Sequence, residues 1–293
     1  MEKLLVKAQA VTAQFQQESI LYERGKIYST FPNAVNILLD GTDELITIQR
    51  EGVPYSPNAI FCNCDEPYSL KRNSVCTFED DMIKCGSKAL STASSTVIDN
   101  RLTNLSPPLR MGLSAATREY FTQAFPVEKC KSTWLSFILH GRTPSEDLFS
   151  KGIKHLIDKL NRYIKYHRPD GAIFFLNEHK GFGRGLTPET DDFFIGLFAA
   201  YIHYLKYFPL INMTDLLQVN NEAMNIYSVN VQRSILGGFM PELLMDALAG
   251  VSSEETKQLA KASRLISNYG HSSGEDMLSG ILFFTAQMQL FLR

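Results

Sequence analysis

The segment from Lys180 to Phe198, KGFGRGLTPETDDFFIGLF, constrains this chain more than any other. Glycine occupies every second position from 181 to 185, so the backbone can adopt positive φ and lie close to a bulky group. A helix is then predicted to begin with Thr187 as its N-cap and Pro188 as its first residue. An ordinary helix start needs one cap and no alternating glycines. We therefore predict that this loop contributes to function.

A second segment near the C-terminus, YGHSSGED at residues 269–276, repeats the same design. Glycines again lead to a predicted helix start. Ser272 and Glu275 have the three-residue spacing of a capping box. The chain therefore has two predicted helices whose N-termini are reached through glycines.

The two predicted helices also share an internal spacing. Asp192 precedes Gly196 by four residues, and Asp276 precedes Gly280 by four, so each helix carries an acid and a glycine on one face. A glycine inside a helix costs about 1 kcal/mol relative to alanine. The matching glycines therefore predict that the two helices pack closely, with both N-termini at one pocket.

The first helix start combines an anion-binding geometry with negative charge. Unpaired N–H groups and the helix dipole favour an anion at such an N-terminus. Glu189, Asp191 and Asp192 would repel a bare phosphate, so a phosphate would need Lys180, Arg184 or a bridging Mg²⁺. The glycine spacing fits neither a Walker loop nor a dinucleotide-binding fingerprint. The structural alternative is a tight connection packed under a neighbouring element.

The glycine motifs carry a family resemblance. Residues 181–196 read Gly-x-Gly-x-Gly-Leu-Thr-Pro-x-x-Asp-Asp-Phe-x-x-Gly, and residues 270–276 read Gly-His-Ser-Ser-Gly-x-Asp. With Phe-x-x-Ala-Val-Asn at residues 31–36, this pattern resembles the AllH-type family. The resemblance implies a bacterial protein linked to oxamate carbamoyltransferase, the last step of anaerobic allantoin (purine) breakdown. It further implies FdrA-like and AllG-like protein partners and a ligand such as carbamoyl phosphate or oxamate.

The chain departs from the family pattern in two places. Glu189 and Thr190 stand where the family usually has Ser-Gly, and residues 225–228 do not keep its Thr-Thr-x-x-Ser-like segment. Two functions therefore remain open. One is a component of an oxamate carbamoyltransferase-like enzyme, and the other is a non-catalytic small-molecule-binding or regulatory subunit with the same fold.

The candidate site follows from the two motifs. Asp192, His271 and Asp276 are the candidate catalytic residues, and both aspartates are candidate Mg²⁺ ligands that we expect to be ionised. Their structural alternatives are compensation of the helix dipole for the acids and a core or cap role for the histidine. The candidate ligand-binding residues are Gly183, Arg184, Gly185, Thr187, Asp191, Gly270, Ser272, Ser273, Gly274 and Asn36, with Ser228 a weaker candidate. Asn36 has a structural alternative as a residue that satisfies hydrogen bonds on the turn side of its strand.

Composition limits the class of protein. The chain has 293 residues, of which 44% are hydrophobic and 20% charged, as in globular proteins. A net charge of −2 argues against general nucleic-acid or anionic-membrane binding. No apolar run approaches the roughly 20 residues that span a bilayer, and no secretory signal is recognisable. These features predict a cytoplasmic protein.

The five cysteines favour no structural zinc site. They lack paired Cys-x-x-Cys spacing, and buried free thiols are the favoured interpretation. Cys62 and Cys64, two residues apart, would point to one face of a strand, which leaves a metal or redox pair as the alternative.

We predict an α+β fold with a β-rich N-terminal domain at residues 1–105 and a helical domain at residues 106–293. Short alternating segments predict strands, and Ile46 and Ile48 alternate with Thr47 and Gln49 as in a half-buried strand. Helical spacing of apolar residues predicts the helices. The predicted strands include Ala34–Leu39, Leu45–Gln49 and 59–62, and the predicted helices include 148–166, 193–208 and 277–291.

Overall fold

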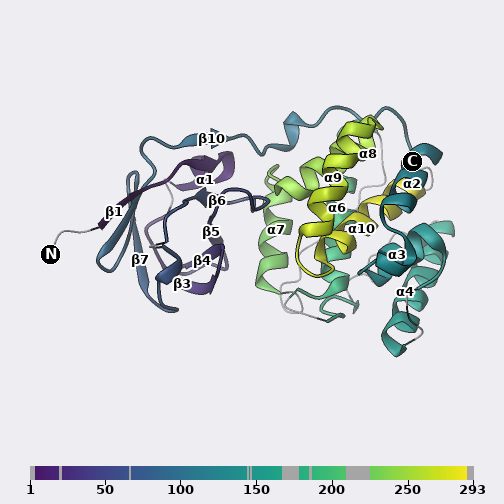
Figure 1. Ribbon diagram of the computed structural model, residues 1–293, viewed down its shortest axis with the longest axis horizontal. Coiled ribbons are helices and arrows are strands. Elements are labelled where there is room, and N and C mark those ends of the chain that lie inside the picture. The colour runs from purple at the N-terminus through teal and green to yellow at the C-terminus, as the bar shows by residue number, and fades with distance from the viewer. Residues whose placement is uncertain are drawn as a thin grey trace. The chain divides into compact units, whose positions relative to one another are not determined.

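The computed structural model describes residues 4–19, 22–65, 67–143, 145, 147–166, 178–184, 187–208 and 225–288. The predicted α+β class is confirmed. The chain divides into two compact units (Figure 1). Unit 1 comprises Met1–Asn104 and Leu236–Glu242, and unit 2 comprises Leu105–Ile235 and Leu243–Arg293.

The described strands of unit 1 form one ten-stranded mixed sheet in the order β1-β9-β8-β7-β3-β4-β5-β6-β2-β10 (Figure 1). Pairs β1–β9, β2–β10 and β5–β6 are parallel, and the other neighbours are antiparallel. The strands are β1 (Leu4–Lys7), β2 (Ala10–Thr12), β3 (Arg24–Phe31), β4 (Ala34–Leu39), β5 (Leu45–Gln49), β6 (Ala59–Phe61), β7 (Val75–Glu79), β8 (Met82–Cys85), β9 (Lys88–Ser91) and β10 (Thr96–Ile98). A short helix, α1 (Ala13–Glu18), follows β2.

The central strands confirm the predicted segments but not the predicted burial of β5. The bounds of β4 and β5 agree with prediction, and β6 ends one residue early. Both faces of β5 are buried, including Gln49, which is 1% exposed. Its amide nitrogen donates to the carbonyls of Val53 and Pro54, both at 3.2 Å. The expectation of a half-buried strand was wrong because the segment after β5 folds back and satisfies its polar groups.

The Asn36 side chain forms hydrogen bonds within this sheet. Its side-chain nitrogen donates to Ser29 Oγ at 2.9 Å, and its side-chain oxygen accepts from Thr47 Oγ1 at 2.9 Å. These three residues belong to neighbouring strands β3, β4 and β5. Both hydrogen-bonding groups of the Asn36 side chain are therefore used across the sheet and not on the turn side of the strand.

The expectation of free thiols was wrong for two of the five cysteines. Cys76 on β7 and Cys85 on β8 are register partners and form a disulfide. Their Cα atoms lie 4.4 Å apart, a separation at which a bridge between antiparallel strands closes. Cys62, Cys64 and Cys130 are not disulfide-bonded.

The segment Leu236–Glu242 joins unit 1, although its sequence neighbours belong to unit 2. Leu102 N donates to Gly238 O at 2.7 Å, and Met240 N donates to Asn100 O at 3.0 Å. Arg101 and Phe239 form an isolated β-bridge. The backbone of unit 1 is therefore completed by residues that lie far along the chain.

Unit 2 is helical. Helix α4 buries the apolar positions that its periodicity predicts, and α6 is buried along nearly its whole length, as predicted. In the described residues, no helix is long and apolar enough to cross a membrane. The helices are α2 (Ala115–Ala124), α3 (Thr133–His140), α4 (Leu148–Lys165), α6 (Glu189–Leu205), α7 (Ile226–Leu236), α8 (Glu242–Ser253), α9 (Thr256–Asn268) and α10 (Ser273–Gln287). Residues 289–291 of the predicted last helix lie outside the described residues.

Helices α6 and α10 pack against each other within unit 2 (Figure 1). At Gly196 of α6, an added Cβ would lie 1.8 Å from the carbonyl oxygen of Met277 on α10. Only a residue without a side chain permits such an approach. The close packing predicted from the matched glycines is therefore confirmed.

Candidate functional site

The two glycine-led helix starts meet at Thr187 and Ser273. The two hydroxyl oxygens lie 3.1 Å apart, and Thr187 Oγ1 donates to Asp192 Oδ2 at 3.0 Å. Ser273 is the first residue of α10, and Thr187 lies two residues before α6. The structure thus brings together two motifs that are more than 80 residues apart in the sequence.

Both predicted caps were wrong in detail. Pro188 is the N-cap of α6, and Thr187 instead reaches forward to the carboxyl group of Asp192. Ser272 is the N-cap of α10 but makes no side-chain capping hydrogen bond there. The side chain of Glu275 does not complete a capping box, because another part of unit 2 supplies its hydrogen-bond donors.

Those donors come from the start of α3. Glu275 Oε2 accepts from Lys131 N at 2.7 Å and from Ser132 N at 2.9 Å. Ser132 also donates its hydroxyl to Asp276 Oδ1, while its Oγ accepts from Leu135 N at 3.0 Å as the N-cap of α3. Sequence reasoning missed Ser132. A serine before an apolar helical run is a readable cap signal, but its distant carboxyl partners are not.

The first glycine loop folds onto the start of α6. Gly181 N donates to Asp191 Oδ1 at 2.7 Å. Gly183 has φ of +150°, and an added Cβ would lie 2.3 Å from Glu189 N. This position therefore requires glycine for both conformation and space. Gly185 lies outside the described residues.

Arg184 is engaged beside this loop. Its Nε lies 3.2 Å from Glu189 Oε1, and its guanidinium lies over the Phe149 ring, 4.4 Å from the centroid. Phe149 stacks on Phe182 with centroids 5.2 Å apart. A phosphate held by Arg184 would have to compete with the buried Glu189 carboxyl group for this cation.

Burial raises the pKa of both candidate catalytic aspartates, Asp192 and Asp276. Desolvation raises the pKa of Asp192 to about 7, although hydrogen bonds from Ser273 and Thr187 lower it. Burial raises the pKa of Asp276 well above its ordinary value, against the hydrogen bond from Ser132. The helix dipole contributes only about 0.3–1 kcal/mol and does not offset this desolvation. Both pKa shifts oppose the expectation that the two aspartates are ionised, and burial favours the neutral form of Asp276.

At the starts of α6 and α10, two buried carboxyl oxygens have no hydrogen-bond partner among the described residues. These atoms are Asp276 Oδ2 and Glu189 Oε2. The two residues are 0% and 4% exposed, respectively. Burial also raises the pKa of Glu189, against the charge of Arg184. Buried polar atoms are rarely left unsatisfied, so these oxygens mark a place for a ligand or a water molecule.

The other candidate residues of the second glycine motif have different surroundings in the structure. His271 is exposed. Burial raises the pKa of Asp276, and the neighbouring Ser272 side chain lowers it. Gly274 is required for packing, because an added Cβ would lie 2.5 Å from Ile266 O at the end of α9. Gly270 lies at φ of +62°, with an added Cβ 3.3 Å from the Ser273 side chain.

Ser228 on α7 is buried, and its hydroxyl has no hydrogen-bond partner among the described residues. Asn225 N, just before α7, lies 3.5 Å from Asp191 Oδ2, which is the upper limit of a hydrogen bond. No group of three or more His, Cys, Asp or Glu side chains in the described parts of the chain is placed to hold a metal. The Mg²⁺ site therefore stays a prediction.

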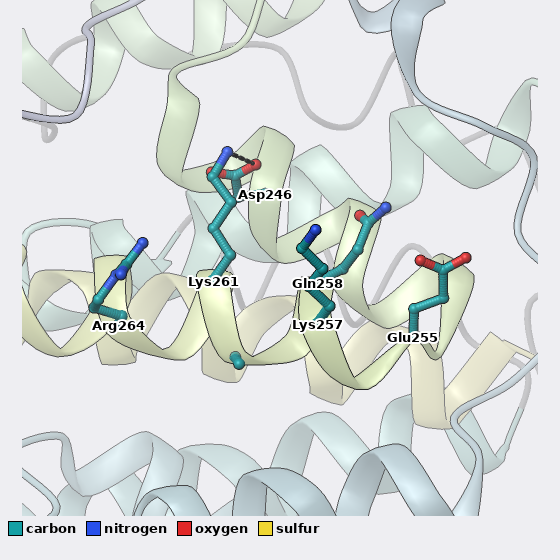
Figure 2. A pocket seen from close by; sticks show the side chains of 7 residues that line it. Asp246, Glu255, Lys257, Gln258, Lys261 and Arg264 are labelled. Carbon is teal, nitrogen blue, oxygen red and sulfur yellow. Dashed lines mark hydrogen bonds and ion pairs between the residues drawn. The ribbon is translucent and has the colours of Figure 1, made fainter.

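A surface cavity in unit 2 lies away from these residues. Its lining consists of Asp246 on α8, Glu255 and residues of α9 (Figure 2). Figure 2 shows basic side chains along one side of α9, with Lys261 Nζ 2.9 Å from Asp246 Oδ1. None of the predicted site residues lines this cavity.

Comparison with models of protein families shows which family this chain belongs to. The AllH family N-terminal domain matches residues 3–99, and a second model, described as oxamate carbamoyltransferase subunit AllH, matches residues 180–285. This chain belongs to the AllH family. The second AllH match contains both glycine motifs and the start of α10. Because the AllH description is that of a subunit, members of the family act with protein partners. Neither the curated proteins nor the solved structures include a match.

Proposed function

We propose that this chain is a subunit of an oxamate carbamoyltransferase-type enzyme and that the paired starts of α6 and α10 bind its carbamoyl-bearing ligand. The observation that carries the proposal is the meeting of the two family motifs at Thr187 and Ser273, 3.1 Å apart. Around this contact lie buried carboxyl groups with unused oxygens. The partners we propose are FdrA-like and AllG-like subunits.

The carboxyl groups suit a carbamoyl group. Ser132 donates to Asp276 Oδ1, so in the neutral acid that burial favours, a proton on Oδ2 can be donated to a carbonyl oxygen. Glu189 Oε2 is an unused acceptor for a carbamoyl N–H. A donor beside an acceptor is the complement of an –NH–C=O group. A donor at the carbonyl oxygen would also stabilise the negative charge that develops there during carbamoyl transfer.

Phosphate is the second half of carbamoyl phosphate. The positive end of the α6 dipole favours an anion, although Thr190 N and Asp191 N already donate to Phe182 O and Pro188 O. A neutral Asp276 would remove one repelling charge. The negative charges of Asp191 and Glu189 would still repel a phosphate. A Mg²⁺ ion between a carboxylate and the phosphate would offset this repulsion. Carbamoyl phosphate binding should therefore strengthen with Mg²⁺, whereas oxamate binding should not depend on it.

Calorimetric titration of the purified chain with carbamoyl phosphate and with oxamate, each with and without Mg²⁺, tests the proposal. Asp276→Asn keeps a neutral side chain that can donate, so it should retain binding. Asp276→Leu has a similar size and no donor, and should weaken binding by about 10-fold or more. Equal affinity in both variants would remove Asp276 from the ligand site.

One observation favours the second candidate, a binding or regulatory subunit without chemistry. Glu189, which stands where the family usually has serine, engages Arg184 at 3.2 Å. This contact occupies the cation that would otherwise meet the phosphate. Carbamoyl transfer should be assayed with the partner subunits present and with Glu189→Ser. Binding of oxamate without transfer in either protein would favour the regulatory candidate.

A further inference from the structure

Cys62 and Cys64 form a close pair of thiols at the end of β6. Their sulfur atoms lie 2.7 Å apart, and neither is disulfide-bonded. Along an extended chain, residues i and i+2 point to the same side, so the spacing directs both sulfurs together. Both cysteines belong to unit 1 and take no part in the proposed carbamoyl site.

The backbone of Cys62 is fixed on both sides. Its N–H donates to Gln49 O at 2.9 Å, which continues the pairing of β6 with β5. Its carbonyl oxygen accepts from Tyr68 Oη at 2.7 Å. These two hydrogen bonds hold the first cysteine in place.

The residue between the two cysteines is fixed as well. Asn63 N donates to Gln9 Oε1 at 3.2 Å, and Asn63 O accepts from Arg50 Nη1 at 3.3 Å. The Asn63 side chain donates to Glu51 Oε2 at 2.7 Å and accepts from Glu51 N at 3.0 Å. The close approach of the sulfurs is therefore set by a braced backbone.

The two thiols differ in access to solvent. Cys62 is 0% exposed and belongs to the apolar core of unit 1, whereas Cys64 is partly exposed and packs against that core. A dissolved reagent would thus meet Cys64 first, with Cys62 already in reach of its sulfur.

We propose that Cys62 and Cys64 are a reversible dithiol–disulfide site that reacts with small organic disulfides. The Cys64 thiolate attacks one sulfur of the reagent, forms a mixed disulfide and releases one reagent thiolate. Cys62 then loses its proton to solvent and attacks the Cys64 sulfur, which forms the Cys62–Cys64 bond and releases the second reagent thiolate. The two cysteines are oxidised, and the reagent is reduced to two thiols.

The test uses the full chain, reduced, freed of reductant and treated with oxidised glutathione. Differential alkylation with peptide mapping then reports each cysteine, with the Cys76–Cys85 disulfide assigned separately. The expected product carries no glutathione and contains a Cys62–Cys64 bond that dithiothreitol reverses. A stable glutathione adduct on Cys64 of the wild type, or no reaction in the folded protein, would overturn the proposal.

Variants separate the two roles. Cys62→Ser should keep glutathione on Cys64 at least about 10-fold longer than the wild type, because the resolving thiol is gone. Cys130→Ser is the matched control, since this buried thiol lies in unit 2, and it should behave as the wild type. A Cys64–Cys130 bond in the wild type in place of the Cys62–Cys64 product would assign the resolving role to Cys130 and overturn the proposed pair.

Discussion

Gly280 lies directly against the backbone of Phe193. A Cβ added to this glycine of α10 would be 2.0 Å from the Phe193 carbonyl oxygen and 2.5 Å from Leu197 N on α6. Together with Gly196, this contact lets the two helix backbones touch in the middle of unit 2. The starts of the same two helices form the candidate site, so the glycine contact sets its geometry.

Gly196→Ala and Gly280→Ala should each destabilise the protein. The added methyl group meets backbone atoms, which cannot move aside as a flexible side chain can. Overpacking of this kind costs about 1–3 kcal/mol or more, beyond the roughly 1 kcal/mol that alanine gains in a helix. Denaturant unfolding of each variant measures the loss.

Gly250→Ala is the control for both. This glycine lies inside α8, where an added Cβ would be 3.4 Å from the nearest atom, an ordinary contact. The change should leave the protein as stable as the wild type or stabilise it by up to about 1 kcal/mol. If Gly196→Ala resembles Gly250→Ala, the two helices are not held by backbone contact.

Stability should fall as pH rises from about 4 to about 7. Burial raises the pKa of Asp192 from 3.8 to about 7, so in this range the folded protein binds more protons than the unfolded chain. The free energy of unfolding therefore decreases with rising pH, by roughly 4 kcal/mol over the whole range. Burial raises the pKa of Asp276 as well, so this acid acts in the same direction.

Unfolding of the wild type and Asp192→Asn at pH 5 and pH 8 isolates this contribution. Between these pH values the variant should lose roughly 3 kcal/mol less than the wild type. His203, whose pKa burial lowers to about 4, acts in the opposite direction but is present in both proteins. The same pH dependence in both would mean that Asp192 is not desolvated.

Ser132→Ala should destabilise the protein by about 2–3 kcal/mol. The change removes the cap of Leu135 N and the donor to the buried Asp276 carboxyl group. Ser114→Ala removes only local hydrogen bonds, to Thr117, at the start of α2 and should cost about 1 kcal/mol. Equal losses in the two variants, measured by denaturant unfolding, would remove Ser132 from the network of acids.

Asn36→Ala should lower stability without changing ligand affinity. The substitution leaves Ser29 and Thr47 without their shared partner in the sheet, at a cost of about 1–3 kcal/mol. Unfolding and calorimetric titration with oxamate measure the two effects separately. A loss of oxamate affinity with normal stability would return Asn36 to the candidate site.

Local pattern predicted much of the fold. The bounds of β4 and β5 followed from short apolar segments between turns, and the buried face of α4 followed from 3.6-residue spacing. The contact of α6 with α10 followed from two glycines at matching positions, because a helix tolerates such glycines chiefly where another backbone approaches.

The features that sequence reasoning missed depend on distant residues. Gln49 is buried by a segment that folds over β5, and Glu275 binds the start of α3 more than 140 residues away. The pKa of Asp276 depends on how completely unit 2 excludes water from it. Such effects have no signature in spacing, because they are set by which elements meet.

The return of Leu236–Glu242 to unit 1 bears on how the protein is made. During synthesis the sheet residues emerge first, but Asn100 and Leu102 gain their backbone partners only after residue 240 has left the ribosome. A fragment ending near residue 105 would lack this segment and expose the groups that it covers. The last backbone contacts of the N-terminal unit therefore form only after most of the helical chain has been synthesised.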